Sequence, residues 1–195
     1  MNRSQPDLGD RDVTAILDEI FDLFARFGSD RYGEDISLER HMLQSAAVAE
    51  AMGASQPVVA AALLHDIGHF LYAEGDAALD PGRDFEHEAL GAAWLSRGFD
   101  REVTAPIALH VRAKRYLCAV EPGYLGRLSD ASRVSLALQG GVMGEDEAAA
   151  FAREAAFEAA LTLRRCDDAG KDPSMRTRTI EDYRGLLTAS LRRPD

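Results

Sequence analysis

The spacing of apolar residues along the chain constrains its fold most strongly. They recur at intervals of three and four residues almost everywhere, and no run alternates apolar with polar residues as a half-buried β-strand does. The clearest stripe runs from Ile16 to Phe27, where Gly28 is expected to end the helix. The periodicity therefore predicts an all-α fold, a helical bundle of about eight helices, in one domain that spans residues 1–195. Only the first ten residues are expected to form a flexible N-terminal tail.

Cap and turn residues predict where the other helices begin and end. Ser37 has the position of an N-cap, and Pro57 suits the first turn of the next helix. That helix should reach His65 and Asp66 before Gly68 breaks or bends the chain. The remaining helices are expected to start at Asp84, at Asp100 with a bend or restart at Pro106, at Ser129, at Glu145 with a long run to about Ala169, and at Ile180, with loops over residues 29–36 and 76–83 and a loosely held connection over 171–178.

The charge balance limits the partners of the chain. Its 195 residues hold 22 Lys and Arg against 33 Asp and Glu, which gives a formal net charge of −11 and a pI near 4.9. We therefore expect no binding to nucleic acid or to anionic membranes, because both need a cationic face. A few buried cations can still bind one small anion.

Cysteine usage and hydropathy predict a cytoplasmic protein. Cys118 and Cys166 lie far apart in the sequence and form neither a CxxC pair nor a disulfide framework. The N-terminus is polar and acidic, unlike a signal peptide, and the longest aliphatic run, Val58 to Leu64, is too short for a membrane span. The oligomeric state does not follow from the sequence.

Histidines and aspartates form the group with the clearest chemical meaning. Four of the five histidines stand at similar intervals, on or beside the ends of different predicted helices, so their imidazoles can converge in a bundle. Two aspartates supply the negative charge that imidazoles lack. Six such ligands are too many for one tetrahedral zinc ion, but they suit two metal ions with open positions. The expected ligands are His41, His65, Asp66, His87, His110 and Asp167.

A structural role is the alternative for each of these residues taken alone. A lone histidine is more often a surface residue or a hydrogen-bonded core residue than a ligand. For the set, this alternative weakens because apolar helical positions surround His41, His65 and His110, and buried imidazoles need polar partners. Lys114 and Arg164 each stand one helical turn from an expected ligand, where they can bind an anion or form ordinary ion pairs.

The same residues resemble a known family. His41, the pair His65-Asp66 and Asp167 resemble the H…HD…D signature of the HD-domain superfamily, whose founding members are metal-dependent phosphohydrolases. With the other histidines, the likeness is closest to the PhnZ/TmpB group of mixed-valent di-iron oxygenases, which cleave the carbon–phosphorus bond of organophosphonates. The segments that carry it are LLHDIGH (63–69), HEALGA (87–92), LHVRAKRYLC (109–118), SLALQGG (135–141) and LRRCDDAGK (163–171).

The resemblance implies a role for each matching residue. It also implies two iron ions, Fe(II) and Fe(III), as cofactors, with O₂ as co-substrate. One iron is bound by His41, His65, Asp66 and Asp167, and the other by Asp66, His87 and His110, so that Asp66 bridges them. Substrate contacts are implied for His69, which lies beside the substrate, and for Lys114, Ser132 and Arg164, which hold the phosphonate.

The loop that precedes the first histidine helix matches the family in part. There the family has a tyrosine that occupies iron until substrate arrives and a glutamate that meets the substrate ammonium. Glu34 stands seven positions before His41, as the family's glutamate does, and Asp35 can assist it. The family's tyrosine would stand at Arg31, whereas Tyr32 lies one residue later. We therefore expect Glu34 to contact substrate and the other three residues to act as lid or cation contacts.

The function that the resemblance implies is O₂-dependent cleavage of a small hydroxyphosphonate. The substrate would be a 1-hydroxy-2-(trimethylammonio or amino)ethylphosphonate, and the products phosphate and glycine betaine or glycine. One alternative is a phosphohydrolase of the same fold, a nucleotidase or phosphodiesterase, because imidazole and carboxylate also suit other divalent metals. Another is an inactive sensing module, which is disfavoured because no expected ligand is missing.

Overall fold

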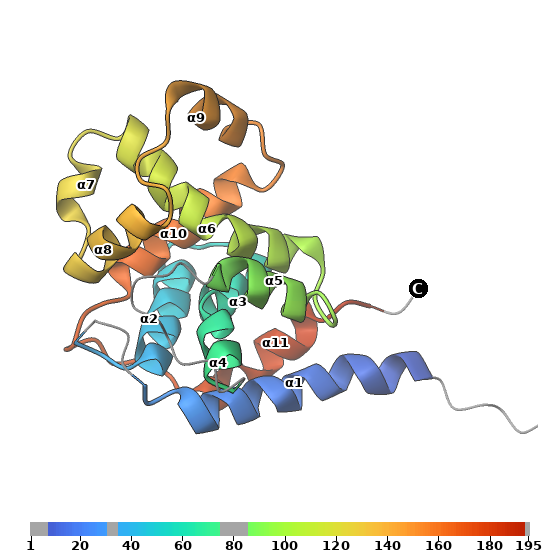
Figure 1. Ribbon diagram of the computed structural model, residues 1–195. Coiled ribbons are helices and arrows are strands. Elements are labelled where there is room, and N and C mark those ends of the chain that lie inside the picture. Colours follow the sequence, from blue (N-terminus) through green and yellow to red (C-terminus); the bar gives the residue numbers. More distant parts are fainter. Residues whose placement is uncertain (1–7, 31–34, 75–85, 194–195) are drawn as a thin grey trace, which may run out of the picture.

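The structure is a computed structural model that describes residues 8–30, 35–74 and 86–193 (Figure 1). These residues form α-helices and one 3-10 helix, and their only β-structure is an isolated bridge between Phe99 and Leu191. The predicted all-α fold is confirmed. The helices are α1 (Leu8–Phe27), α2 (Leu38–Ala51), α3 (Gln56–Leu64), α4 (Ile67–Glu74), α5 (His87–Leu95), α6 (Arg101–Val120), α7 (Tyr124–Arg127), α8 (Asp130–Leu138), α9 (Glu145–Phe151), α10 (Phe157–Ala169), η1 (Ile180–Tyr183) and α11 (Arg184–Ser190).

Four helices build the centre of the bundle. α10 packs against α6 and α2, and α3 packs against the same two helices (Figure 1). Their shared core consists of fully buried apolar side chains, among them Leu64, Ile107 and Leu163. α1 runs along the base of the bundle, where Ile20 and Phe24 enter the same core. The helices that carry the expected metal ligands are thus held together by a continuous apolar core.

A second group of helices surrounds the C-terminal half of α6. α7, α8 and α9 lie there (Figure 1), around two smaller apolar clusters. One cluster contains Phe151 and Met143, and the other contains Tyr124 and Leu136. None of the helices within the described ranges has the length and apolarity to cross a membrane.

The pattern over residues 145–169 predicts one long helix, but the chain forms two. α9 ends at Phe151 and α10 begins at Phe157. In one continuous helix these two rings would point about 120° apart. The turn between them lets both rings pack on Tyr116, at centroid distances of 5.4 and 5.2 Å, and leaves Phe151 fully buried.

The expected helix break at Gly68 was also wrong. Gly68 lies inside α4, and the interruption falls earlier, at His65 and Asp66, between α3 and α4. Pro106 does not restart its helix either, because α6 runs through it from Arg101 to Val120. A proline near the start of a helix removes only one backbone hydrogen bond, which the packing of α6 compensates.

Most of the expected helix starts can be compared with the structure: Asp100 and Ser129 are the N-cap residues of α6 and α8, α9 begins at Glu145, and η1 begins at Ile180, as predicted. Ser37 caps α2 as predicted, since its Oγ accepts the Arg40 N–H at 3.3 Å. α5 has Glu86 in the cap position instead of Asp84, which lies outside the described residues together with the predicted loop over 76–83. At the N-terminus, α1 begins at Leu8, within the ten residues expected to be flexible.

The connection after α10, which was expected to be loosely held, is anchored to α2. Gln44 Nε2 donates to the carbonyl oxygen of Asp172 at 2.7 Å, and Gln44 Oε1 accepts the Asp172 N–H at 3.0 Å. Arg40 adds a bond of 2.8 Å to the carbonyl oxygen of Pro173. A buried glutamine therefore fixes the segment through its backbone, which apolar periodicity does not reveal.

Candidate metal centre

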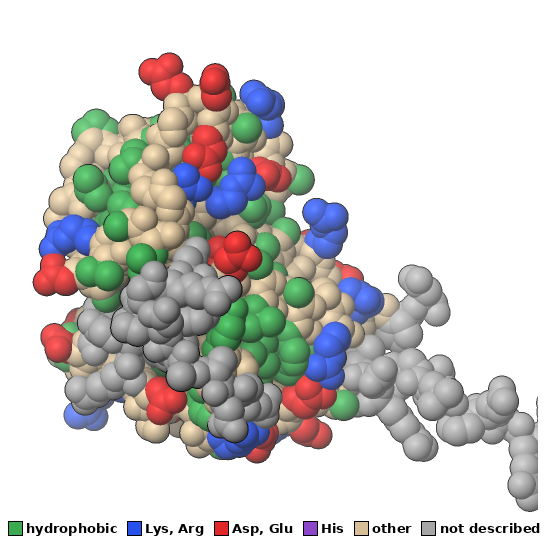
Figure 2. Space-filling model, in the orientation of Figure 1, with side chains coloured by type: hydrophobic (Ala, Val, Ile, Leu, Met, Phe, Trp, Pro, Cys, Tyr) green, Lys and Arg blue, Asp and Glu red, His purple; other side chains and the backbone are tan. Residues whose placement is uncertain are grey.

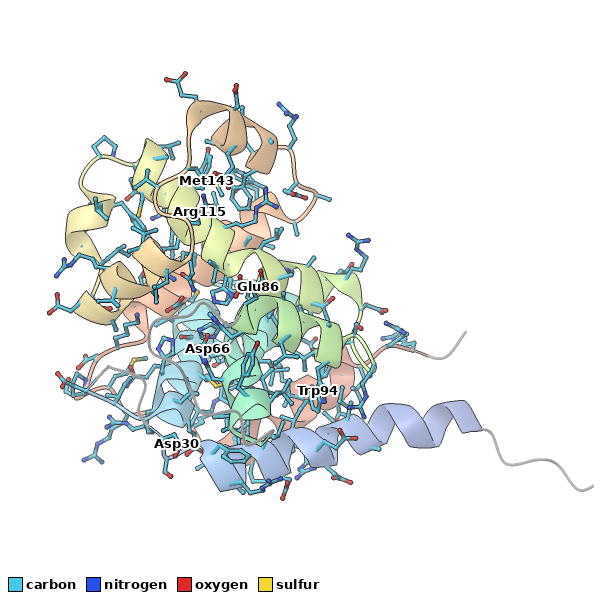
Figure 3. All side chains as sticks on the ribbon, viewed as in Figure 1. Asp30, Asp66, Glu86, Trp94, Arg115 and Met143 are labelled. Atoms are coloured by element: carbon cyan, nitrogen blue, oxygen red, sulfur yellow. The ribbon has the colours of Figure 1, made fainter. Side chains whose placement is uncertain are left out.

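The six expected metal ligands come together in the interior of the bundle. Each is at most 9% exposed, and Figure 3 shows Asp66 inside the bundle at the end of α3. The described surface visible in Figure 2 carries acidic, basic and apolar side chains and no histidine. The six residues are His41 of α2, His65 and Asp66 between α3 and α4, His87 at the start of α5, His110 of α6 and Asp167 of α10.

One carboxylate oxygen of Asp66 faces a first group of donors. Asp66 Oδ2 lies 3.4 Å from His65 Nε2 and 3.6 Å from His41 Nε2. The two nitrogens are 3.2 Å apart, and Asp167 Oδ1 lies 3.3 Å from His41 Nε2. Donors bound to one metal ion at about 2.1 Å are separated by roughly 3.0–3.4 Å. These four atoms therefore have nearly the spacing of one coordination sphere.

The other carboxylate oxygen of Asp66 faces a second group. Asp66 Oδ1 lies 3.3 Å from His87 Nε2 and 3.8 Å from His110 Nε2. These two nitrogens are 3.3 Å apart. Asp66 thus divides its two oxygens between two pairs of imidazoles, which is the arrangement of a carboxylate that bridges two cations.

The hydrogen bonds of three imidazoles leave a lone pair on the Nε2 atom that faces the centre of the site. The Nδ1 atoms of His41, His65 and His110 each lie 2.8–2.9 Å from a backbone carbonyl oxygen. A carbonyl only accepts, so Nδ1 carries the hydrogen in a neutral imidazole and Nε2 is free to bind a metal. Two lone pairs that face each other at 3.2 Å repel unless a cation lies between them. The donor set therefore fits metal ions on chemical grounds.

The carboxylates of the site are held in their ionised form. Burial acts to raise the pKa of Asp66, but the imidazoles around it hold that pKa well below its usual range. Burial acts in the same way on Asp167, where the charges of Arg164 and Lys171 and the contact with His41 together outweigh it and keep the pKa well below normal. Both aspartates are therefore available as anionic ligands.

The imidazoles divide into two kinds. Burial lowers the pKa of His65 and His110, so both are neutral. Burial also acts to lower the pKa of His41 and His87, but the carboxylates beside them raise it above normal. Each facing pair thus combines one histidine of each kind.

Close backbone contacts bring these groups together. A Cβ on Gly68 would lie 2.0 Å from the carbonyl oxygen of His87, so only glycine lets α5 pack against α4 at this point. A Cβ on Gly170 would lie 2.5 Å from Ser45 Oγ, and the Gly170 carbonyl oxygen is the one that orients His41. Glu86 adopts a left-handed backbone (φ 48°), unusual for a residue other than glycine, directly before His87 at the start of α5.

Three basic side chains lie next to the aspartates, and we call Lys114, Arg164 and Lys171 the cation cluster. Arg164 Nη1 donates to Asp167 Oδ2 at 2.8 Å, and Lys171 Nζ lies 3.7 Å from the other oxygen of that carboxylate. Burial and then the charge of Arg164 lower the pKa of Lys114 to about 8. Ser132 Oγ lies 2.9 Å from Lys171 Nζ and 3.5 Å from Arg164 Nη2. Three cations this close favour a bound anion.

Comparison with known proteins agrees with this geometry. The family described as HD domain matches residues 38–133, a range that holds five of the six expected ligands. A relative from Leisingera caerulea, named [1-hydroxy-2-(trimethylamino)ethyl]phosphonate dioxygenase (glycine-betaine-forming), is 41% identical over 175 residues, which is 89% of this chain and 89% of the relative. The chain belongs to the HD-domain family. This confirms the family membership that the H…HD…D signature predicted.

Two other relatives of this HD-domain protein align over comparable lengths. A protein of Gimesia maris named hydroxymethylphosphonate dioxygenase is 41% identical over 165 residues, 84% of this chain and 82% of the relative. An uncharacterised protein of Acanthamoeba polyphaga mimivirus is 34% identical over 174 residues, 88% of this chain and 80% of the relative. Phosphonate dioxygenases are thus similar to this HD-domain protein over most of their length.

The other expected substrate residues are partly at the site. His69 stacks on His87 with ring centroids 4.2 Å apart, and burial followed by the charge of His87 lowers the pKa of His69 to about 3. Asp35 is exposed. The remaining loop residues, Arg31, Tyr32 and Glu34, lie outside the described residues.

Several residues of the cation cluster and its partners were not among the expected site residues. They are Lys171, Ser135 and Gln139. Lys114 Nζ donates to Ser135 Oγ at 2.7 Å and to Gln139 Oε1 at 2.5 Å. Ser132, Ser135 and Gln139 succeed one another at helical spacings of three and four, so one face of α8 and its end present all three. Their spacing from Ser132, which was expected, is the sequence signal that would have found Ser135 and Gln139.

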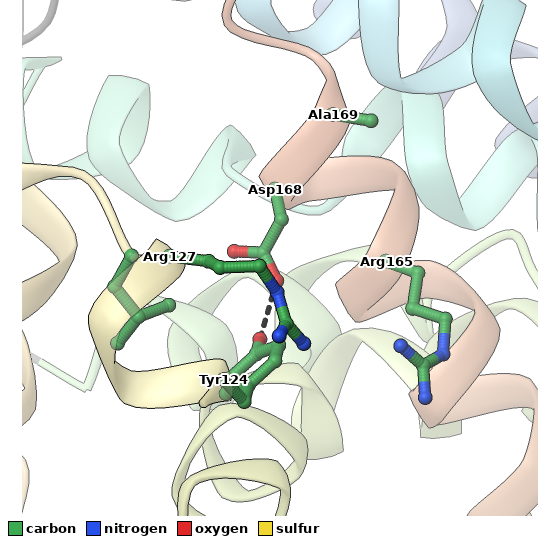
Figure 4. A pocket seen from close by; sticks show the side chains of 6 residues that line it. Tyr124, Arg127, Arg165, Asp168 and Ala169 are labelled. Carbon is green, nitrogen blue, oxygen red and sulfur yellow. Dashed lines mark hydrogen bonds between the residues drawn. The ribbon is translucent and has the colours of Figure 1, made fainter. Parts of the chain in front are cut away.

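A groove of about 320 Å³, whose lining is drawn in Figure 4, lies next to Arg164 of the cation cluster. Arg164 bonds to two of its wall residues, Tyr124 and Asp168. None of the six expected ligands lines it. Its walls are formed by Tyr124, Arg127, Leu128, Arg165, Asp168 and Ala169.

Proposed function

We propose that this HD-domain protein uses two iron ions and O₂ to cleave the carbon–phosphorus bond of a small 1-hydroxyphosphonate. One observation carries the proposal: Asp66 divides its carboxylate between two pairs of facing imidazoles, and a cation cluster lies beside them. The likeness to two proteins named as phosphonate dioxygenases supports this chemistry for such a site.

In this proposal Asp66 would hold both iron ions. His41, His65 and Asp167 would complete the ligands of one iron, and His87 and His110 those of the other. When bound, the iron pair supplies the redox chemistry with O₂. The chain itself orients the imidazoles through their Nδ1 bonds to backbone carbonyls, and it keeps both carboxylates ionised.

The cation cluster is the proposed site for the phosphonate group. A phosphonate dianion offsets the mutual repulsion of Lys114, Arg164 and Lys171, and the Ser132 hydroxyl can donate to one of its oxygens. His69 is neutral because its pKa is about 3, so it can offer a hydrogen bond beside the substrate without adding charge. Burial of the whole site excludes water from the reacting carbon.

The proposed reaction consumes one O₂ for each substrate molecule. At C1 the C–H and C–P bonds break, and R–CH(OH)–PO₃²⁻ with O₂ gives R–COO⁻, HPO₄²⁻ and H⁺. The products are phosphate and a carboxylate, glycine betaine or glycine for the trimethylammonio or amino substrate. For a cationic substituent R we propose Glu34 and Asp35 as contacts and Arg31 and Tyr32 as lid residues, a proposal that rests on the family resemblance of this loop.

The decisive experiment measures phosphate release with and without oxygen. The iron-loaded protein is given hydroxymethylphosphonate and the two 1-hydroxy-2-substituted ethylphosphonates. We expect phosphate in air, one O₂ consumed for each phosphate, and none under argon. Equal rates in both atmospheres would refute the proposal. Oxygen-independent release of phosphate from nucleotides with added Mn²⁺ would instead support a phosphohydrolase.

A further inference from the structure

Arg164 is held by a closed ring of hydrogen bonds on the side away from the metal ligands. Its Nε donates to Tyr124 OH at 3.1 Å, and its Nη2 donates to Asp168 Oδ1. Tyr124 OH in turn donates to Asp168 Oδ2, the bond drawn in Figure 4. Tyr124 and Asp168 therefore hold the guanidinium at two of its nitrogens, which fixes its orientation.

This ring of hydrogen bonds is needed because other forces favour movement of Arg164 away from the site. Lys114 and Lys171 repel it from the side of the site, and a long arginine side chain loses substantial rotamer entropy when it is fixed. The groove behind Tyr124 and Asp168 offers it room to move away. Tyr124 is itself fixed, since its ring is buried in the apolar cluster with Leu136.

We propose that Tyr124 and Asp168 are positioning residues that aim Arg164 at a tetrahedral oxyanion in the cation cluster. The inference rests on the proposed function only in the choice of anion, a phosphonate or the phosphate product. Neither residue touches that anion. They act by keeping two guanidinium N–H groups turned toward Ser132 and Asp167.

The chain offers a matched control for a test. Tyr183 is as buried as Tyr124, its OH donates to the Glu50 carboxylate at 3.2 Å, and the Arg178 guanidinium lies 4.3 Å from its ring centroid. Tyr183→Phe therefore removes a bond of the same kind from a second tyrosine–carboxylate–arginine group, one that shares no residue with the metal site.

The experiment measures the dissociation constant of inorganic phosphate by calorimetry on the metal-loaded full chain. We expect Tyr124→Phe to weaken phosphate binding about tenfold or more, the cost of a lost bond to a charged group, and Tyr183→Phe to change it less than about twofold. Melting temperatures should fall by similar amounts in both variants, which separates positioning from stability. Tyr124→Phe with the affinity of the wild type would overturn the inference.

A second measurement tests whether Tyr124 acts through Arg164. In an Arg164→Lys background the ring is already broken, so adding Tyr124→Phe should change the phosphate affinity less than about twofold. A further tenfold loss there would overturn the inference, as would absence of phosphate binding by the wild type. Failure of oxygen-dependent turnover with this pattern of phosphate binding intact would refute the proposed reaction and leave the positioning role standing.

Discussion

Replacement of Gly68 by alanine tests how closely α4 and α5 must approach for the site to form. The added Cβ would lie 2.0 Å from the His87 carbonyl oxygen, whereas real Cβ contacts essentially never fall below 3.0 Å. The backbones at Gly68 and His87 must therefore move apart by about 1 Å. Metal–ligand distances tolerate only about ±0.2 Å, so His87 can no longer share an ion with Asp66 and His110.

With the iron pair proposed above, we expect Gly68→Ala to retain the ion at His41 and to bind the second ion roughly 10- to 100-fold more weakly, the effect seen when ligand-orienting groups are lost. Elemental analysis after dialysis should then give close to one iron per chain. Gly185→Ala is the matched control, because nothing lies within 4 Å of its added Cβ. Two tightly bound irons in Gly68→Ala would refute this view of the close contact.

Three further predictions concern charge, metal and core. Burial and the charge of Arg164 lower the pKa of Lys114 to about 8 in the anion-free protein, so its ammonium form is lost as the pH rises from about 7 to 9. Phosphate affinity measured by calorimetry should therefore fall over that range. Lys114→Arg should abolish the fall, because arginine keeps its charge. A chelator should lower the melting temperature, because six buried ligands lose their common partners, and an unchanged value would contradict metal binding at this site. Leu163→Ala should cost about 2–5 kcal/mol of unfolding free energy in urea titrations, since Leu163 is fully buried in the core around the site.

The sequence was most informative where one physical rule decides the local structure. Apolar spacing alone predicts the part of α1 from Ile16 to Phe27, and Ser37 predicts the start of α2 because a hydroxyl satisfies an N–H that the helix leaves unpaired. The expected ligands meet because they lie on helices that share one core. Their positions in the sequence therefore sufficed to predict both the family and the convergence of these side chains.

Other features depend on contacts between residues that are distant in the sequence. α9 and α10 separate because Phe151 and Phe157 both pack on Tyr116, a residue of α6. Gly68 is needed for the backbone of His87 and not for a break in its own helix. Lys171 was missed although it stands four residues after Asp167, because it follows the glycine at the end of α10, and only the fold places its Nζ beside Ser132 and Asp167.

Metal analysis of the purified protein tests the central claim most directly. Protein from iron-supplemented cells should contain two iron ions per chain and give the electron paramagnetic resonance signal of a coupled Fe(II)/Fe(III) pair. Asp66→Ala should lose both the second ion and the signal, because Asp66 is the only carboxylate shared by the two groups of imidazoles among the described residues. A single ion per chain in the wild type, or an unchanged signal in Asp66→Ala, would contradict a bridged pair of metal ions at this site.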